Sequence, residues 1–333
     1  MANKTTANFI GVNDDYSGTS GAWSITEARE RKLSSVHGEN WGGGDSPFDL
    51  DFLVIGGGGG SGRNPYVAHG GGGAGGYLNS FGSEASGANS TGLAGKSVLT
   101  NEDFTVTVGA GGAEGANGSN SVFSGTDASN NAFTLTATGG GRGGDNQDAG
   151  NGGSGGGAGS NWQRTTTYAV SRASGDGTAN QGFDGADVSG SITVASATLC
   201  NTLGTAYWCD SFSSLAGGGG GGAGGAASGH TGGAGLASSI TGSSVTRAGG
   251  GAGMRNGSEQ TSGTGRDQAG GGGVNGLSGS NNTGNNGTVI LRYPNTLTIN
   301  FSAAALTATT ATDGSDKVTT FTAGSGTVSW SYI

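Results

Sequence analysis

The side chains that could do chemistry are few and lie far apart along this chain. His37, His69 and His230 are its only histidines, and no motif links any of them to a nucleophile. A zinc site usually needs four histidine, cysteine or carboxylate ligands at close spacing. Cys200 and Cys209 could form a disulfide across the loop between them, or they could remain two free thiols. The sequence therefore predicts no metal site and no cofactor, and it leaves the state of the cysteines open.

Paired carboxylates are further candidates for catalysis, and two such pairs illustrate them. Asp145 lies close to Asp148, and Asp184 lies close to Asp187. Two carboxyl groups that flank a glycosidic bond can hydrolyse it. Acids in solvated loops are much commoner than catalytic pairs, and nothing else in the chain supports hydrolysis. We therefore expect no catalytic residue and no enzyme.

One glycine-rich stretch matches the spacing of a phosphate-binding loop. Gly57 and Gly62 follow an apolar strand at residues 51–55 with four residues between them. Arg63 stands where such a loop requires lysine, and Pro65 interrupts any helix that would follow. Polyglycine meets patterns of this kind by chance, so we expect no nucleotide to bind here.

Side chains of the kind used in recognition are concentrated in an insert at residues 160–215. The candidate receptor-binding residues in this insert are Trp162, Arg164, Tyr168, Tyr207 and Trp208. Flat aromatic rings bury a large area at low entropic cost, so they suit contacts with sugars or protein loops. Alternatively, these rings only pack the insert against the rest of the protein.

A second candidate surface lies near the N-terminus. Residues 24–27 (Ser-Ile-Thr-Glu) form a capping box, which predicts a helix through about Val36. Trp23 and Trp41 bracket this helix, and Leu33 lies on its apolar face. So short a helix is marginal in water by itself. We therefore expect Trp23, Leu33 and Trp41 to contact another subunit or another protein.

Glycine accounts for 78 of the 333 residues, against roughly 7% in ordinary proteins. Its runs could be flexible linkers, which Gly/Ser composition favours. However, the runs are short, and apolar residues such as Tyr77 and Leu215 interrupt them. Extended helices with three residues per turn lack internal hydrogen bonds, so they must pair with neighbouring backbones. We predict packed polyglycine II-type helices joined by long loops. Collagen is excluded because there are three prolines and no sustained Gly-X-Y period.

Strands are predicted where apolar residues alternate with polar ones or form short runs. The segments are residues 51–55, 104–108, 133–138 and 288–293, with weaker signals at 121–124 and 191–195. Residues 297–301 also alternate, and residues 317–323 and 327–333 read as a β-hairpin around 324–326. The sequence thus predicts a mainly β fold in three parts: an N-terminal attachment segment (1–47), a glycine-rich body (48–294) and a small C-terminal β domain (295–333).

The charge balance excludes several kinds of partner. The chain has 14 basic and 23 acidic residues, a formal net charge of −9. Binding to nucleic acid or to anionic membranes needs basic surface, so we expect neither. No apolar run reaches the length of a membrane span, and the first residues lack the apolar core of a secretory signal. A protein that works outside the cell without such a signal could be released by lysis, as virion components are.

Several segments resemble, in the same order, the glycine-rich tail-fibre and adhesin-type structural proteins of tailed bacteriophages, those of marine phages in particular. These segments are residues 51–60, 70–78, 104–112, 117–123 and 287–294. The resemblance implies a β-sandwich-like body from which packed polyglycine helices extend, with loops between the helices that contact a host receptor. It also implies an extracellular place on the virion, in the tail or another appendage.

The partners implied by the resemblance are other virion proteins, a host cell-surface receptor (polysaccharide or outer-membrane protein) and further copies of the chain. The alternative is a purely architectural protein of a virion or an extracellular filament, without receptor binding.

Overall fold

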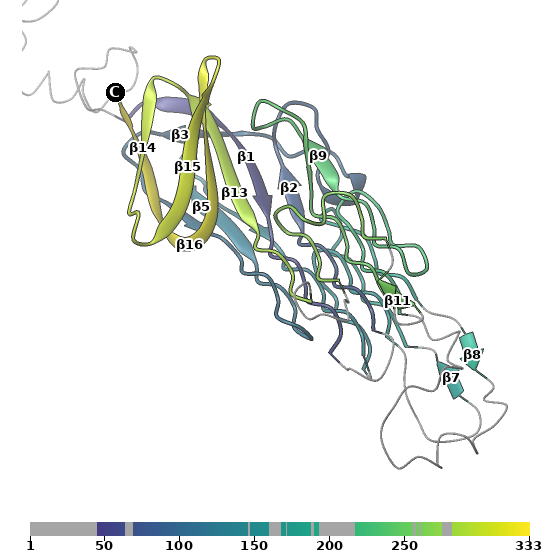
Figure 1. The fold of residues 1–333 in the computed structure, drawn as a ribbon. Coiled ribbons are helices and arrows are strands. Elements are labelled where there is room, and N and C mark those ends of the chain that lie inside the picture. Colours follow the sequence, from purple (N-terminus) through teal and green to yellow (C-terminus); the bar gives the residue numbers. More distant parts are fainter. Residues whose placement is uncertain are drawn as a thin grey trace, which may run out of the picture.

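The computed structural model describes residues 45–63, 69–145, 147–159, 168–170, 172–187, 190–192, 217–255, 258–259, 261–274 and 282–333. This part of the chain is mainly β, as predicted, with a β-sandwich at one end and the glycine runs extending from it (Figure 1). The elements are β1 (Pro47–Ile55), β2 (Tyr77–Asn79), the 3₁₀ turn η2 (Gly87–Asn89), β3 (Lys96–Leu99), β4 (Phe104–Thr107), β5 (Ser121–Thr126), β6 (Ala132–Ala137), β7 (Tyr168–Val170), β8 (Gly190–Ile192), β9 (Leu236–Ser238), β10 (Val245–Arg247), β11 (Met254–Arg255), β12 (Ser258–Glu259), β13 (Thr288–Pro294), β14 (Leu297–Phe301), β15 (Leu306–Asp313) and β16 (Asp316–Tyr332).

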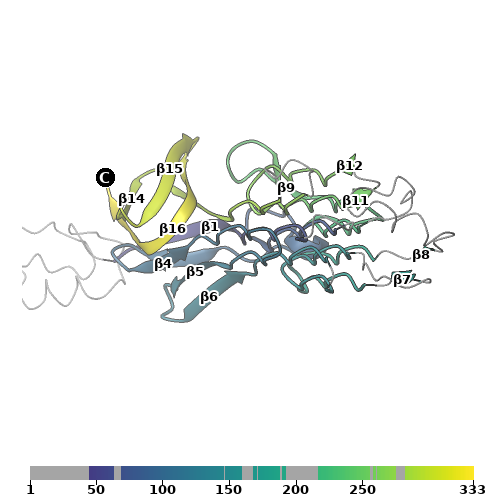
Figure 2. The same ribbon diagram turned by 60° about the horizontal axis from the view of Figure 1, so that its bottom comes forward.

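One ten-stranded antiparallel sheet folds over on itself to make the sandwich. Its strand order is β2-β1-β13-β16-β4-β5-β6, with β14 and β15 also paired to β16 and β3 paired to β1. The first half of β16 lies between β13 and β15. In its second half, residues 325–328 pair with β4 and residues 328–332 pair with β14. The strand therefore passes from one layer of the sandwich to the other (Figure 2).

The hairpin predicted around residues 324–326 is wrong, because β16 continues through them without a turn. Gly324 adopts a φ of 98°, and a Cβ atom there would lie 2.0 Å from the carbonyl oxygen of Ala305. The glycines thus allow a bend between the layers rather than a reversal of the chain. The hairpin turn lies earlier, between β15 and β16, where Gly314 has a φ of 62°.

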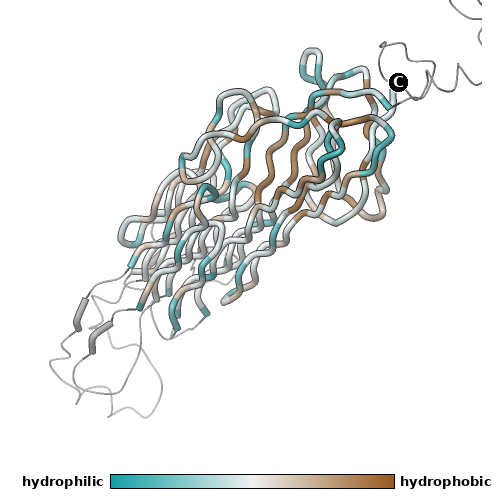
Figure 3. The backbone as a smooth tube through the Cα atoms, turned by 180° about the vertical axis from the view of Figure 1, so that it is seen from behind, coloured by the Kyte–Doolittle hydropathy of each residue, from teal (hydrophilic) through white to brown (hydrophobic). Residues whose placement is uncertain are grey.

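The hydrophobic core lies between the two layers. Trp330 is fully buried there, and its ring meets Phe48, Phe104 and Tyr293 edge-on at centroid distances of 5.3, 5.3 and 5.8 Å. Such aromatic pairs contribute about 0.5–1.5 kcal/mol each beyond the area that they bury. Hydrophobic residues are concentrated on these strands, whereas the glycine runs are near neutral (Figure 3).

The other face of the sheet is also covered at its centre. Leu53 and Ile290 point away from the main core and pack in a second cluster with Tyr77 and Ile240, which stands in the loop between β9 and β10. Burial on both faces explains why residues 52–55 of β1 and 289–291 of β13 are continuous apolar runs, whereas the first half of β1 alternates.

The glycine runs between residues 56 and 287 pack side by side as one bundle, called the glycine bundle from here on. In residues 56–61, successive backbone N–H groups donate to three neighbouring segments in rotation. Gly56 donates to Gly76, Gly57 to Ser119, Gly58 to Asn285, Gly59 to Gly73, Gly60 to Ala116 and Ser61 to Asn282, at 2.8–3.0 Å. Residues three apart therefore donate to the same neighbouring segment, as expected for packed helices with three residues per turn.

The central runs of the glycine bundle are surrounded on all sides by backbone. Residues 70–76 hydrogen-bond through their N–H and C=O groups to six segments: 56–62, 138–144, 154–157, 218–221, 251 and 270–273. A Cβ atom at Gly72 would lie 2.1 Å from the carbonyl oxygen of Gly59, and one at Gly58 would lie 2.0 Å from that of Gly271. Glycine is therefore required here because the backbones approach each other so closely.

The predicted division into three parts stays a prediction. The N-terminal helix, with Trp23, Leu33 and Trp41, lies outside the described residues. At the other end of the chain, β14, β15 and β16 pair within the same sheet as the strands of the body and share its core. No helix in the part of the chain that the structure describes has the length and apolar character of a membrane span.

Candidate recognition end of the glycine bundle

Several chain segments reach the end of the glycine bundle that lies farthest from the sandwich, called the distal end from here on (Figures 1 and 2). Backbone hydrogen bonds hold these segments in register. Gly70 donates to Gly144, and Gly144 donates to Gly157, at 2.9 and 2.8 Å. Met254 donates to His69 at 3.2 Å and accepts a bond from Gly217 at 2.7 Å. The connections that follow or precede these residues therefore start from fixed positions.

Of the described parts of the insert, β7 and β8 stand at the distal end (Figure 1). Tyr168 begins β7, which pairs antiparallel with β8 in the register Tyr168↔Ile192 and Val170↔Gly190. This pairing fixes the position of the Tyr168 backbone. The other predicted receptor-binding residues, Trp162, Arg164, Tyr207 and Trp208, lie outside the described residues, as do Cys200 and Cys209.

Residues 172–187 tie the insert to the glycine bundle. Gly177 forms a parallel bridge with Gly152, and Phe183 exchanges backbone hydrogen bonds with Gly155 and Gly222. At the distal end Arg172 forms an ion pair with Asp148 at 3.7 Å. The two side chains are 30% and 63% exposed, so this pair adds little stability.

Gln181 joins this part of the chain to the sandwich at the gap between β2 and β6. Its side-chain oxygen accepts a hydrogen bond from the N–H of Thr138 at 2.8 Å, and its side-chain nitrogen donates to the carbonyl of Thr136 at 3.2 Å. Its backbone carbonyl accepts from the N–H of Tyr77, the first residue of β2. One glutamine therefore satisfies polar groups at both strand edges.

Three of the four carboxylates considered for catalysis accept hydrogen bonds from backbone N–H groups. Asp145 accepts a hydrogen bond from the N–H of Gln147 at 3.0 Å. Asp184 accepts one from Gly177, and Asp187 accepts one from Ser174, both at 2.7 Å. Bonds of this kind fix the backbone of turns. Among the described residues, no three histidine, cysteine or acidic side chains are placed to hold a metal ion.

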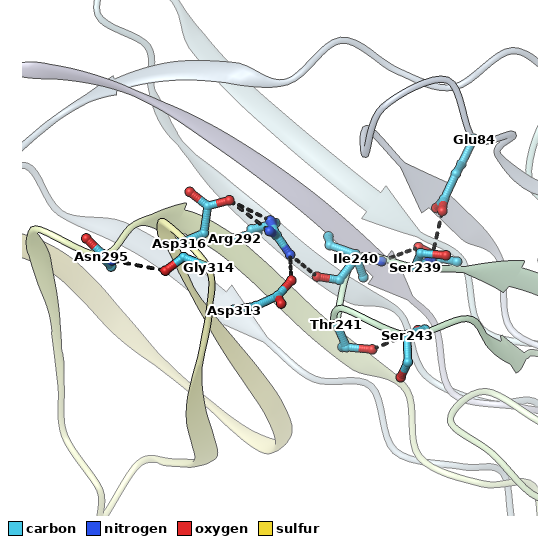
Figure 4. A network of polar contacts seen from close by, with 11 residues as sticks. Glu84, Ser239, Ile240, Thr241, Ser243, Arg292, Asn295, Asp313, Gly314 and Asp316 are labelled. Atoms are coloured by element: carbon cyan, nitrogen blue, oxygen red, sulfur yellow. Dashed lines mark hydrogen bonds and ion pairs between the residues drawn. The ribbon is translucent and has the colours of Figure 1, made fainter.

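A partly buried polar network fixes the loop between β9 and β10 to the sandwich (Figure 4). Arg292 of β13 donates to Asp313 at 2.7 Å, to Asp316 at 2.9 Å and to the carbonyl of Ile240 at 3.2 Å. Burial disfavours the charge of this guanidinium, but its bonds to the two carboxylates outweigh burial and raise the pKa of Arg292 above its ordinary value. Glu84 accepts the N–H of Ser239 at 2.7 Å from the other side of the same loop.

Sequence reasoning did not identify Gln181 or Arg292, because the partners of both residues come from distant parts of the chain. No local motif contains them. The one available signal was weak: Arg292 interrupts the apolar run of β13. A charged residue in such a run indicates a buried partner of opposite charge.

The family described as "Glycine-rich domain" matches residues 34–294 of the chain. Neither the curated proteins nor the solved structures contain a match.

Proposed function

Because this chain belongs to the glycine-rich domain family and its glycine bundle separates the sandwich from the distal end, we propose that it is a structural protein of a bacteriophage virion. In this proposal it forms part of a tail fibre or adhesin and attaches the phage to its host. The phage assignment rests on the resemblance of residues 51–60, 70–78, 104–112, 117–123 and 287–294 to tail-fibre proteins.

One observation carries the proposed role in attachment. The described chain begins at the sandwich end, where Ser46 accepts a hydrogen bond from the N–H of Thr100. β1 then runs toward the glycine bundle, and the insert leaves the bundle at the distal end. The segment proposed to contact the virion and the segment proposed to contact the host are thus joined to opposite ends of one scaffold.

Recognition by the insert is tested by truncating its tryptophans. Trp162→Ala and Trp208→Ala should each weaken binding of the purified protein to host envelopes or capsular polysaccharide. Loss of a hot-spot tryptophan typically costs ~2 kcal/mol, about thirtyfold in affinity. Leu93, 39% exposed and outside the insert, provides a control as Leu93→Ala. Normal binding by both folded tryptophan variants would refute recognition by the insert and favour the architectural alternative. Release of oligosaccharides from the capsule would show that the protein is an enzyme.

Attachment to the virion is tested separately. Deletion of residues 1–44 removes the predicted helix and leaves the described sandwich and glycine bundle intact. The truncated protein should fold but should not be incorporated into particles. Normal incorporation would show that Trp23, Leu33 and Trp41 are not needed for assembly.

A further inference from the structure

One edge of the sandwich is long, uncharged and open. Within the described part of the chain, β15 pairs with β16 on one side only. Residues 307–312 have the sequence Thr-Ala-Thr-Thr-Ala-Thr, and five of the six are exposed. Natural proteins usually protect such an edge with charges, proline or a covering loop. This edge has no charged residue and no proline between Leu306 and Asp313.

The register identifies which backbone groups face outward. The two-residue turn at 314–315 is closed by the pair Asp313↔Asp316, which is a hydrogen-bonded pair in hairpins of this length. Alternate residues then direct their N–H and C=O groups away from β16. These residues are Thr312, Thr310 and Ala308.

The other edges of the two layers are partly covered. At β2, the carbonyl of Asn79 accepts the N–H of Leu93 at 2.7 Å. Gln181 occupies the end of β6, as described above. At β14, the carbonyl of Leu297 accepts a hydrogen bond at 2.7 Å from the side chain of Lys317, a residue of β16. Gln181 and Lys317 each cover only one end of their strand, and β15, with eight residues, is the longest of the described edges that is left without such a contact.

We propose that the β15 edge is a self-association surface, on which β15 of a second copy pairs antiparallel about a two-fold axis at Thr310. In this register Thr310 faces Thr310 of the second copy, and Ala308 faces Thr312. In each of these pairs, both residues direct their backbone N–H and C=O groups toward the other copy, as hydrogen bonding between antiparallel strands requires. The two sheets would then become one continuous sheet across the interface.

The self-complementary register of this uncharged edge favours a second copy as the occupant. Each copy carries a net charge of −9, so two copies repel each other at long range and can pair only where acidic groups are kept apart. In the proposed register Thr309 faces Ala311, and Asp313 faces Thr307, so no carboxylate faces a carboxylate. An edge of this length buries less than the ~1,600 Å² of a standard interface. We therefore expect a weak dimer that forms with increasing concentration.

Charge swapping across the edge tests both the surface and the register. Thr309 and Ala311 are exposed and face each other across the proposed axis. The variant Thr309→Lys/Ala311→Lys places lysine against lysine, and Thr309→Glu/Ala311→Glu places glutamate against glutamate. Each should raise the dimer dissociation constant roughly tenfold or more, and an equal mixture should restore dimers. The control Thr298→Lys/Asn300→Lys changes exposed residues of β14 and should dimerise like the wild type.

Sedimentation equilibrium of the full chain over a range of concentrations gives the result, with thermal melting of each variant to show that it folds. Dimers lost in each charged variant and restored in the mixture would support the proposal. A wild type that stays monomeric at every concentration would overturn it. So would a larger assembly, a dimer unaffected by the substitutions, or binding of this edge only to a different protein.

Discussion

The close packing of the glycine bundle predicts that a single added methyl group is costly. Gly220 lies in a fully buried run, and a Cβ atom there would lie 2.1 Å from the carbonyl oxygen of Gly72. To reach ordinary contact at 3.4 Å, the two backbones must separate by about 1.3 Å (3.4 − 2.1). The same residue donates to Gly251 and accepts from Gly233, both at 2.9 Å, so the separation also strains these bonds.

These effects give the expected size of the loss. Overpacking a close-packed interior costs ~1–3 kcal/mol, and each buried hydrogen bond that is weakened adds ~1 kcal/mol. Gly220→Ala should therefore lower the free energy of unfolding by about 3 kcal/mol. At ~2 °C per kcal/mol for a chain of this size, Tm falls by roughly 6 °C.

Gly225→Ala is the matched control. It adds the same methyl group in the same sequence context, but the nearest atoms to its Cβ, in Ala234, are 3.5 Å away. Alanine also restricts the unfolded chain, so this variant should be as stable as the wild type or up to ~1 kcal/mol more stable. Differential scanning calorimetry of both variants decides the matter. Equal melting temperatures for Gly220→Ala and Gly225→Ala would refute the packing argument.

Three further predictions concern polar groups. Gln181→Leu should speed amide hydrogen exchange at Thr138 and cost about 2 kcal/mol of stability, because it removes the acceptor for that N–H; unchanged exchange would contradict this. Burial raises the pKa of Asp51, so its contribution to stability is present at low pH and is lost as pH rises through the raised pKa. Asp51→Asn should thus be more stable than the wild type at pH 7, by a margin that shrinks as pH falls from the raised pKa toward the ordinary value of about 4 and stays constant below it; a margin that does not change over this range in chemical denaturation would argue against it. Arg292→Met leaves Asp316 without its bond at 2.9 Å and should cost about 2 kcal/mol, whereas Arg292→Lys should retain part of the stability. Equal stability of the two Arg292 variants in urea would exclude a role for charge.

The strands that the sequence predicted correctly are those with enough residues to show a pattern. The segments at 51–55, 104–108, 133–138 and 288–293 correspond to β1, β4, β6 and β13. Strands of three residues, such as β2 and β9, are too short for any periodicity to be seen.

The error in β16 has a different origin. Glycine and serine at 324–326 are what a hairpin turn requires, but a strand that bends between two layers requires the same freedom at Gly324. The pairing partners decide between the two structures. Residues 325–328 pair with β4, about 220 residues earlier in the chain, so no local signal could have indicated the bend.

The candidate site shows a similar limit. The insert could be located from its composition, because aromatic residues are conspicuous in a glycine-rich chain. The contacts that support the insert could not be predicted from the sequence, because most of them are backbone hydrogen bonds that any residue could make. The bond from Gly70 to Gly144 is one example.

This kind of scaffold suits the role in recognition that we propose. The glycine bundle is held by backbone hydrogen bonds, and the six neighbours of residues 70–76 contribute little besides N–H, C=O and space. A substitution in a connecting segment at the distal end therefore removes none of the contacts that hold the bundle together. In a fold held by side-chain packing, a changed loop often disturbs the core beneath it. Here the connecting segments can vary while the positions from which they start stay fixed, which is the property that a receptor-binding surface needs.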